Sequence, residues 1–267
     1  MVKAIVAGAG GRMGGRIINM ITATKGIELS GAFERPDSDT VGKDAGVVAG
    51  IGELGVPIAD SIDKVIDAGD VIIDFTFHEA TVKHAEKAAE KAKAMVIGTT
   101  GFSPEEYSRI EALSKSFPCV LAPNMSVGVN LLYKLLEMAA KVLGDDYDVE
   151  IVEAHHRMKK DAPSGTALQL GKVVAAALGR DFDKVAVFER HGLIGERSRQ
   201  EIGIQTIRAG DIVGEHTVLF GGIGERVEIT HKASSRDTFA KGAVRAAIWV
   251  KDRSAGFYNM QDVLGLS

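Results

Sequence analysis

The residue types best suited to proton transfer and anion binding gather in the range 150–166. The adjacent residues His155 and His156 follow a strand-like apolar run, Lys159 comes shortly after them, and Ser164-Gly165-Thr166 opens a helix-like run. Successive residues of a strand point to opposite sides, so only one histidine should face a given reacting atom. The N-terminus of a helix presents backbone N–H groups to anions. The pattern therefore predicts a carboxylate receptor beside a general acid.

Less specific interpretations of the same residues stay open at this point. A histidine at a strand end is often structural, Ser164 can be only a helix cap, and Arg157 and Lys160 can be solvated surface charges. A zinc site is the weaker alternative, because adjacent histidines lack the i, i+4 spacing that puts two ligands on one helix face. We assign no chemistry to the remaining histidines, which are His78, His84, His191, His216 and His231.

Composition limits the class of protein. Of the 267 residues, 45% are hydrophobic and 25% are charged, which is ordinary for a globular chain. A net charge of −4 gives no general attraction to nucleic acid or to an anionic membrane. The single cysteine, Cys119, excludes intrachain disulfides and cysteine-cluster zinc sites. No secretory signal pattern and no apolar stretch of about 18 residues is found, so we expect a cytoplasmic protein without membrane spans.

The first residues predict a strand, a glycine-rich turn and a helix. Residues 2–7 form the apolar run, and Gly8, Gly11 and Gly14 follow with the spacing G-x-x-G-x-x-G. Met13 stands where the third glycine of G-x-G-x-x-G would fall. Glycines let the backbone approach a pyrophosphate whose charge the helix N-terminus stabilises, although an ordinary tight turn can carry the same pattern.

A second predicted strand, at 27–33, ends in Glu34 and Arg35. An acid at this position commonly binds the adenosine ribose hydroxyls, and an arginine beside it can accept a 2′-phosphate. With the turn and helix before it, this strand end predicts dinucleotide binding with tolerance for both NADH and NADPH.

Strands and helices continue to alternate up to about residue 126. Strands are predicted at 71–76, 94–97 and 119–121 and helices at 79–93 and 103–115, the second opened by the capping box Ser103-Pro104-Glu105-Glu106. Residues 36–61 are expected to form a long loop with a short strand at 56–58. Repeated β-α units predict an α/β fold with a Rossmann-type doubly wound parallel sheet. The segments 74–76, 98–100 and 122–125 should border one crevice beyond the strand ends.

From Val127 the pattern becomes that of a second, α+β domain. Helices are predicted at 130–143 and 166–178, a strand at 148–154, and strand-like runs at 184–188, 202–208, 212–220 and 226–232. Glycines bound these runs, so a mostly antiparallel sheet is expected. Residues 236–251 return to helix. We therefore predict a dinucleotide-binding domain made of 1–126 with 236–267, and an inserted substrate domain at 127–235.

Several motifs together resemble the 4-hydroxy-tetrahydrodipicolinate reductase (dihydrodipicolinate reductase) family over essentially the whole chain. In chain order they are G-A-G-G-R-M-G, E-R, D-F-T, G-T-T-G-F, A-P-N-M-S, E-A-H-H-R-M-K-K-D-A-P-S-G-T-A, R-A-G-D-I-V-G-E-H and I-T-H-K-A-S-S-R. The resemblance implies reduction of a cyclic imine dicarboxylate in the diaminopimelate route to lysine. It also implies NADH or NADPH as cofactor and a cytoplasmic homotetramer, with oligomerisation through the inserted domain. Met158 departs from the family, many of whose members carry a polar residue or histidine there.

The resemblance also implies roles for single residues. His155 would be the proton donor and acceptor and Lys159 the catalytic proton donor. His156 and Ser164 would contact the substrate, and Gly165 and Thr166 would hold a substrate carboxylate. The cofactor would contact Gly8, Ala9, Gly10, Gly11, Arg12, Met13, Glu34, Arg35, Gly98, Thr99, Thr100, Ala122, Pro123, Asn124 and Met125. No metal site is expected.

The implied reaction suits these residues. Hydride must reach C4 of the conjugated ring, which pushes negative charge toward the ring nitrogen and its carboxylate. Lys159 or protonated His155 can stabilise that charge, and the sequence leaves open which of them delivers the proton. Domain closure is expected, since the two sites lie on different domains. Two alternatives are a sensor that binds NAD(P)H without turnover and a metal-dependent hydrolase, which lacks suitably spaced acidic ligands.

Overall fold

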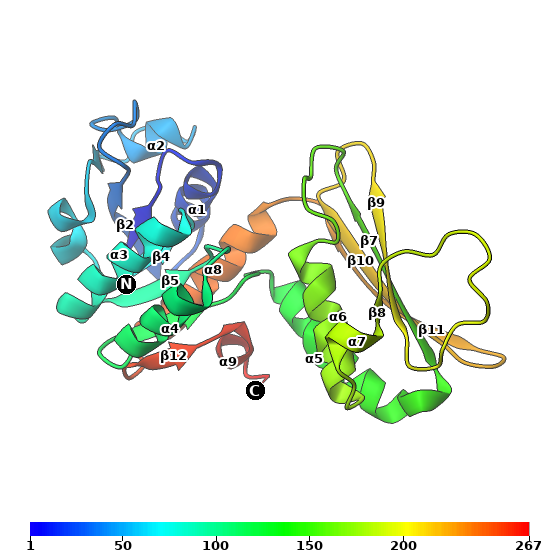
Figure 1. Ribbon diagram of the computed structural model, residues 1–267. Helices are drawn as coiled ribbons and strands as arrows, with labels where there is room; N and C mark the ends of the chain where they lie inside the picture. The colour runs from blue at the N-terminus through cyan, green and yellow to red at the C-terminus, as the bar shows by residue number, and fades with distance from the viewer. Residues whose placement is uncertain (267) are drawn as a thin grey trace. The chain divides into compact units, whose positions relative to one another are not determined.

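The computed structural model describes residues 1–266, which form two compact units (Figure 1). The first unit combines residues 1–127 with the chain from 237 onward, and the second is 128–236. Each unit has its own sheet and its own hydrophobic core, so each is described separately. No helix within residues 1–266 has the length and apolar character needed to cross a membrane.

A seven-stranded sheet with the order β12-β6-β5-β4-β1-β2-β3 forms the centre of the first unit. Every pairing between neighbouring strands is parallel, as predicted. The carboxyl ends of the strands therefore meet along one edge of the sheet. The strands are β1 (Val2–Ala7), β2 (Ile27–Phe33), β3 (Ile58–Ala59), β4 (Val71–Asp74), β5 (Ala94–Ile97), β6 (Pro118–Leu121) and β12 (Gly256–Tyr258).

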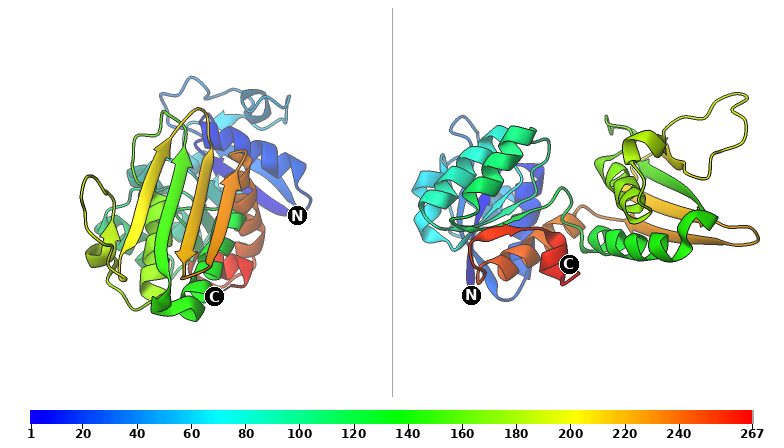
Figure 2. Two further views of the ribbon diagram at one scale, coloured as in Figure 1. Left: turned by 90° about the vertical axis from the view of Figure 1, so that its right-hand side faces the viewer. Right: turned by 60° about the horizontal axis from the view of Figure 1, so that its bottom comes forward.

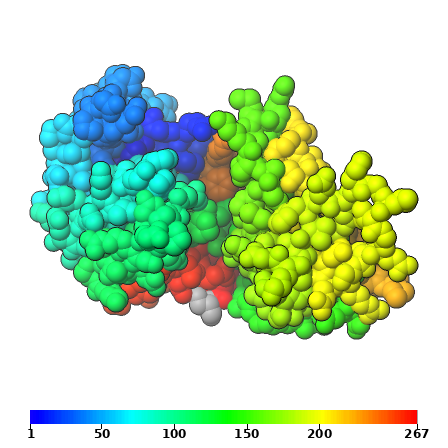
Figure 3. Space-filling view, in the orientation of Figure 1, coloured from blue at the N-terminus to red at the C-terminus, as the bar shows by residue number. Residues whose placement is uncertain are grey.

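Helices cover both faces of this sheet, because the strands carry apolar side chains on both faces. Val6 belongs to a core shared with α1 and α8, whereas the neighbouring Ile5 belongs to a core shared with α3 and α4. In Figure 3, α3 and α4 form a continuous outer surface in cyan and blue-green. The helices are α1 (Arg12–Ala23), α3 (His78–Glu90), α4 (Pro104–Leu113), α8 (Asp237–Val250) and α9 (Met260–Leu264).

Local signals account for several element ends. Ser103 and Glu106 form the predicted capping box of α4. The segment 36–61 is more structured than the predicted loop, because Asp44 caps the short helix α2 (Ala45–Val48) and also accepts N–H groups of Leu54 and Val56. The Leu54 hydrogen bond is the largest of several that lower the pKa of Asp44, although burial opposes them. Strand β12 and helix α9 were not predicted.

The second unit is built on a five-stranded sheet with the order β11-β10-β7-β9-β8. Strand β10 is antiparallel to β11 and β7, but β7 is parallel to β9, and β9 to β8. The prediction of a mostly antiparallel sheet was therefore wrong, because a long crossover rather than a hairpin joins β7 to β9. The strands are β7 (Asp148–His155), β8 (Ala186–Val187), β9 (Ile202–Arg208), β10 (Gly214–Gly221) and β11 (Arg226–Ala233).

Helices α5 (Val127–Leu143) and α6 (Gly165–Ala177) pack on one face of this sheet. In the part of the chain that the structure describes, the other face carries no helix (Figure 2, left). Part of the strand predicted at 184–188 is the helix α7 (Phe182–Val185) instead. Strand β7 alternates strictly, with Val149, Ile151, Glu153 and His155 on the buried side. A carboxylate and a histidine therefore continue the row of core residues.

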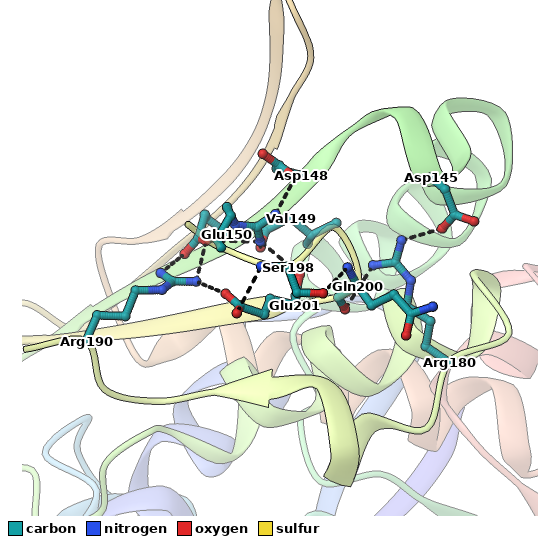
Figure 4. Close-up of polar contacts among 10 residues, drawn as sticks. Asp145, Asp148, Val149, Glu150, Arg180, Arg190, Ser198, Gln200 and Glu201 are labelled. Atoms are coloured by element: carbon teal, nitrogen blue, oxygen red, sulfur yellow. Dashed lines mark hydrogen bonds and ion pairs between the residues drawn. The ribbon is translucent and has the colours of Figure 1, made fainter. Parts of the chain in front are cut away.

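Ion pairs attach the segment between β8 and β9 to the start of β7 (Figure 4). Arg190 donates to the two carboxylate oxygens of Glu150 at 2.9 and 2.8 Å and to Glu201 at 3.2 Å. Arg197 pairs with Asp148 and donates to Glu150 at 3.3 Å. Planar, bidentate arginine–carboxylate pairs are geometrically specific. They fix one end of β7, and the other end carries the candidate acid.

Candidate active site

The inner face of β7 ends in a carboxylate and a histidine. Glu153 has no solvent exposure, and its Oε2 lies 2.6 Å from Nδ1 of His155. A carboxylate can only accept, so Nδ1 carries the proton and Nε2 is the ring atom left for proton transfer. A Cβ on Gly214 would stand 3.1 Å from this Nε2, so the glycine keeps space open beside it.

Strand β9 completes the hydrogen bonding of Glu153. Arg208, paired in register with His155, donates to both carboxylate oxygens at 2.8 Å, and the Thr206 hydroxyl donates at 3.3 Å. Burial alone would raise the pKa of Glu153. Hydrogen bonds from His155, Arg208 and the Ser164 N–H outweigh burial and lower this pKa well below its usual range. Glu153 is therefore a carboxylate at neutral pH.

The same carboxylate holds the start of α6. The Ser164 N–H donates to Oε1 of Glu153 at 3.0 Å, and the Ser164 hydroxyl accepts the Ala167 N–H at 3.2 Å. Ser164 is only 2% exposed, so its side chain is the helix cap that the sequence left open. The exposed residue Gly165 and then Thr166 form the first turn, which contains no acidic residue. This helix end suits an anion.

His216 belongs to β10, the strand that flanks β7 on the side opposite to β9. It pairs in register with Glu153, its ring centroid is 5.2 Å from that of His155, and its Nε2 is 3.1 Å from the Ser164 hydroxyl. It is 4% exposed. Burial first, and then the charge of His155, lower the pKa of His216 to about 4. His216 is thus a neutral wall of the site at neutral pH.

Lys159 and His156 lie on the loop between β7 and α6. Nζ of Lys159 is 2.9 Å from Asp161, and the lysine side chain is 20% exposed. Nε2 of His156 is 3.4 Å from the guanidinium of Arg236, whereas His155 binds Glu153, so the histidine pair has separate surroundings. The exposed residues of the loop include Arg157, Lys160 and Met158, the last at 78%. Met158 is thus a surface residue.

Three kinds of group are therefore provided by one short stretch of the second unit: an oriented imidazole, a lysine and the N-terminus of α6. Together they can bind an anion and move a proton. Among residues 1–266, the structure has no group of three or more His, Cys, Asp or Glu side chains that could hold a metal ion.

In the first unit, the glycine turn between β1 and α1 is closely packed. Gly8 has a φ of +67°, and a Cβ on Gly14 would stand 2.1 Å from the Gly8 carbonyl oxygen. The N-cap residue, Gly11, makes no side-chain bond, and the first turn of α1 contains no acid. A bare helix end behind a tight glycine turn fits a pyrophosphate.

Glu34 already contacts this turn. It accepts the Gly10 N–H at 3.1 Å and the Arg35 N–H at 3.0 Å, while the Arg35 side chain is 74% exposed and 3.4 Å from Asp37. Gly8, Gly11, Glu34 and Arg35 line a pocket of about 850 Å³. Its volume and its acid–arginine rim fit the adenosine part of a dinucleotide.

The other predicted cofactor residues lie at the same edge of the sheet but outside the lining of that pocket. The Thr76 N–H donates to the Thr99 hydroxyl at 3.1 Å, which joins the ends of β4 and β5. Four side chains are buried, those of Ala9, Thr99, Ala122 and Met125, so a ligand can reach chiefly their backbone. The exposed members are Gly10, Arg12, Thr100 and Pro123, and the partly exposed ones are Met13, Gly98 and Asn124.

Sequence reasoning missed three groups that organise the site. Glu153 precedes His155 by two residues in a predicted strand, and this spacing alone could have indicated a shared face. The register of β9 brings Arg208 into contact with Glu153, and the register of β10 places His216 opposite Glu153. No local pattern contains those registers, so these two residues could not have been assigned.

Family comparison covers both units. The family model described as the N-terminus of dihydrodipicolinate reductase matches residues 2–125, and that of its C-terminus matches residues 128–264. The proteins named 4-hydroxy-tetrahydrodipicolinate reductase from Geotalea daltonii and Syntrophus aciditrophicus are 59% and 58% identical to the chain. The match covers 100% of this chain and of the Geotalea protein, and 99% of this chain and of the Syntrophus protein.

Solved structures share the fold. A dipicolinate-bound dihydrodipicolinate reductase from Paenisporosarcina sp. TG-14 superposes with a TM-score of 0.78, at 24% identity and 98% coverage of both chains. An amine dehydrogenase from Mycobacterium smegmatis reaches a TM-score of 0.60 at 18% identity, covering 97% of this chain and 95% of its own. At these identities the likeness establishes the architecture alone.

The buried, neutral state of His216 should make the second unit sensitive to acid. Between pH 6.5 and about 4 the unfolded chain binds a proton at this histidine that the folded protein does not, so stability falls as the pH falls. His216→Gln removes that difference. We expect its free energy of unfolding, measured by urea titration, to fall less than that of the wild type over this range, by up to about 3 kcal/mol. Above pH 7 the two curves should run parallel; equal losses in acid would contradict a neutral His216.

Proposed function

Because this chain belongs to the dihydrodipicolinate reductase family and is an oxidoreductase, we propose that it reduces 4-hydroxy-tetrahydrodipicolinate to tetrahydrodipicolinate with NADH or NADPH. This is the reaction expected for the diaminopimelate route to lysine. The observation that carries the proposal is the buried carboxylate of Glu153, which binds Nδ1 of His155 and the start of α6 at once. The same carboxylate therefore positions both the proposed acid, His155, and the proposed anion receptor at the start of α6.

Residues 1–126 and 236–267 are proposed to bind the dinucleotide. The Gly8–Gly14 turn and the end of α1 would hold the pyrophosphate, and Glu34 would accept the ribose hydroxyls. Arg35, exposed and loosely paired, would reach a 2′-phosphate. Residues 98–100 and 122–125 would supply backbone groups farther along the same edge. When bound, the reduced nicotinamide supplies the hydride that C4 of the substrate ring accepts.

Residues 127–235 are proposed to bind the substrate and to form the oligomer. The N–H groups of Gly165 and Thr166, aimed by the Ser164 cap, would bind one ring carboxylate, and His156 would contact the substrate. As C4 gains a hydride, negative charge moves toward the ring nitrogen and its carboxylate. His155, held through Nδ1, or Lys159 would stabilise this charge and then deliver a proton. The same groups would assist the loss of water from the hydroxylated substrate.

Assembly and location are part of the proposal. A cytoplasmic homotetramer is what the family resemblance implies. The helix-free face of the second sheet supports association, because it carries partly exposed apolar side chains, Val152 at 36% and Ile207 at 46%. Light scattering of the purified protein gives the mass that tests it.

A coupled assay tests the activity. The condensation product of pyruvate and aspartate semialdehyde is supplied with NADH or NADPH, and nicotinamide absorbance is followed. We expect consumption of reduced cofactor that depends on both substrates. No change with either cofactor would reject the reductase and leave a dinucleotide sensor as the better hypothesis.

Lys159→Ala should lower kcat in this assay by about 100-fold or more, as expected when a general acid is lost. Lys160→Ala is the matched control, because it removes an exposed neighbouring lysine. We expect the control to retain kcat within about twofold, the usual scale for surface substitutions. Equal kcat values for the two variants would assign Lys159 to the surface.

Arg35→Ala should weaken the binding of NADPH more than that of NADH, since the 2′-phosphate of NADPH loses a charge-assisted hydrogen-bond partner. Dissociation constants from fluorescence titration measure this difference. Lys25→Ala, which removes an exposed cation of the same unit outside the pocket lining, is the control and should change neither constant. Equal losses for both cofactors in Arg35→Ala would remove the claimed phosphate contact.

A further inference from the structure

Arg208 of β9 has one more partner than the buried carboxylate that it neutralises. Its Nη1 and Nη2 each donate to one oxygen of Glu153 at 2.8 Å, and Nη2 also donates to the backbone carbonyl oxygen of Asp161 at 2.7 Å. The Arg208 side chain is 19% exposed. A guanidinium is planar and carries its N–H groups in a rigid fork. Arg208 therefore fixes the backbone of Asp161 at a set position relative to Glu153.

The side chain of Asp161 in turn holds Lys159. Its Oδ2 lies 2.9 Å from Nζ of the lysine. Burial would raise the pKa of Asp161, but the hydrogen bond from Lys159 and further contacts lower it below its ordinary value. Asp161 is therefore a carboxylate at neutral pH. It binds Arg208 through its backbone and Lys159 through its side chain.

The loop that carries Lys159 is attached to the end of β9 a second time. The N–H of Arg157 donates to the carbonyl oxygen of Gly210, just beyond that strand, at 3.1 Å. Because the loop is bound again at Asp161, only residues 158–160 lie between the two attachments. Lys159 is the middle one of these three, so its backbone has little freedom to move away from the strand end.

We propose that Arg208 and Asp161 are positioning residues. They hold the two candidate acids, His155 and Lys159, at a fixed separation, so that both act on one substrate molecule. Arg208 binds Glu153, which orients the ring of His155. Arg208 also binds Asp161, which pairs with Lys159. This role rests on the proposed function and deepens it: one acid stabilises the charge that develops at the ring nitrogen and its carboxylate while the other delivers the proton.

The alternative is that Arg208 only neutralises Glu153 and that its contact with Asp161 has no effect on the reaction. Asp161→Ala separates the two roles. It removes the partner of Lys159 but keeps the backbone carbonyl that Arg208 binds, and it leaves the contacts of Glu153 in place. The Asp161 side chain is 60% exposed, so we expect the variant to fold with a Tm within about 3 °C of the wild type.

Steady-state kinetics in the coupled assay measure the effect. We expect Asp161→Ala to lower kcat by about 10-fold, because a catalytic group is misplaced, and to change KM by less than about threefold. In a chain that already carries Lys159→Ala, the same change should cause no further loss of kcat, because Asp161 acts only through that lysine. An unchanged kcat in Asp161→Ala, a rise in KM alone, or equal losses of kcat in both backgrounds would overturn the proposal.

Two matched arginine variants test the other half of the link. Arg208→Lys keeps a positive charge beside Glu153 but cannot bind both of its oxygens and the Asp161 carbonyl at once. Arg190→Lys makes the same change at the other end of β7, where Arg190 donates to both oxygens of Glu150 (Figure 4). Both variants should lower Tm, but only Arg208→Lys should lower kcat, by about 10- to 100-fold. Equal kcat values for the two variants would contradict the role of Arg208.

The outcomes stay distinguishable if a variant fails. Should Arg208→Lys not fold, the kcat of Asp161→Ala in the two backgrounds decides the proposal, because the exposed Asp161 side chain is not needed for the contacts of Glu153. Absence of turnover in the wild type itself would instead reject the proposed function.

Discussion

A single carboxylate that water cannot reach holds the candidate site of the second unit together. Glu153 accepts hydrogen bonds from Arg208 and Thr206 of β9, from His155 of β7 and from the backbone N–H of Ser164, the N-cap residue of α6. Burying a charge is costly, and this cost is offset only when all the partners are in place. Losing one partner of such a cluster typically destabilises a protein by about 3–5 kcal/mol. The site therefore forms as a unit with its sheet.

The first unit uses the same device with different partners. Asp74 ends a buried strand, binds a histidine through one oxygen and accepts hydroxyl and N–H donors through the other. No arginine enters this cluster within the described residues, whereas Arg208 donates to both carboxylate oxygens of Glu153. Glu153 is thus neutralised by a permanent cation. Asp74 instead binds the ring of His84, whose Nδ1 lies 2.7 Å from Oδ2.

Patterns that repeat within a few residues made much of the fold predictable. The strand–glycine turn–helix at the N-terminus, the capping box at Ser103 and the helix predicted at 236–251 depend on local chemistry, and the structure contains all three. The parallel course of β7 and β9 was not predictable, because it depends on a long crossover. Glu153 could have been found from its spacing to His155, but Arg208 and His216 meet it only through sheet register. The pairing of His84 with Asp74 was not predicted either, because the two residues lie on different elements, ten residues apart.

The geometry of Glu153 also limits how far the proposed acid and the proposed carboxylate receptor can move apart. One oxygen of this group binds His155 at 2.6 Å, and the other binds the Ser164 N–H, directly before the first turn of α6, at 3.0 Å. Because the two oxygens belong to one planar group, a shift of α6 displaces the carboxylate and the imidazole with it. Small losses of alignment are expensive in reactions that depend on orientation. One side chain thus fixes the position of the proposed proton donor relative to the proposed anion site. Ser164 connects that side chain to α6, because its N–H donates to Glu153 and its hydroxyl caps the helix.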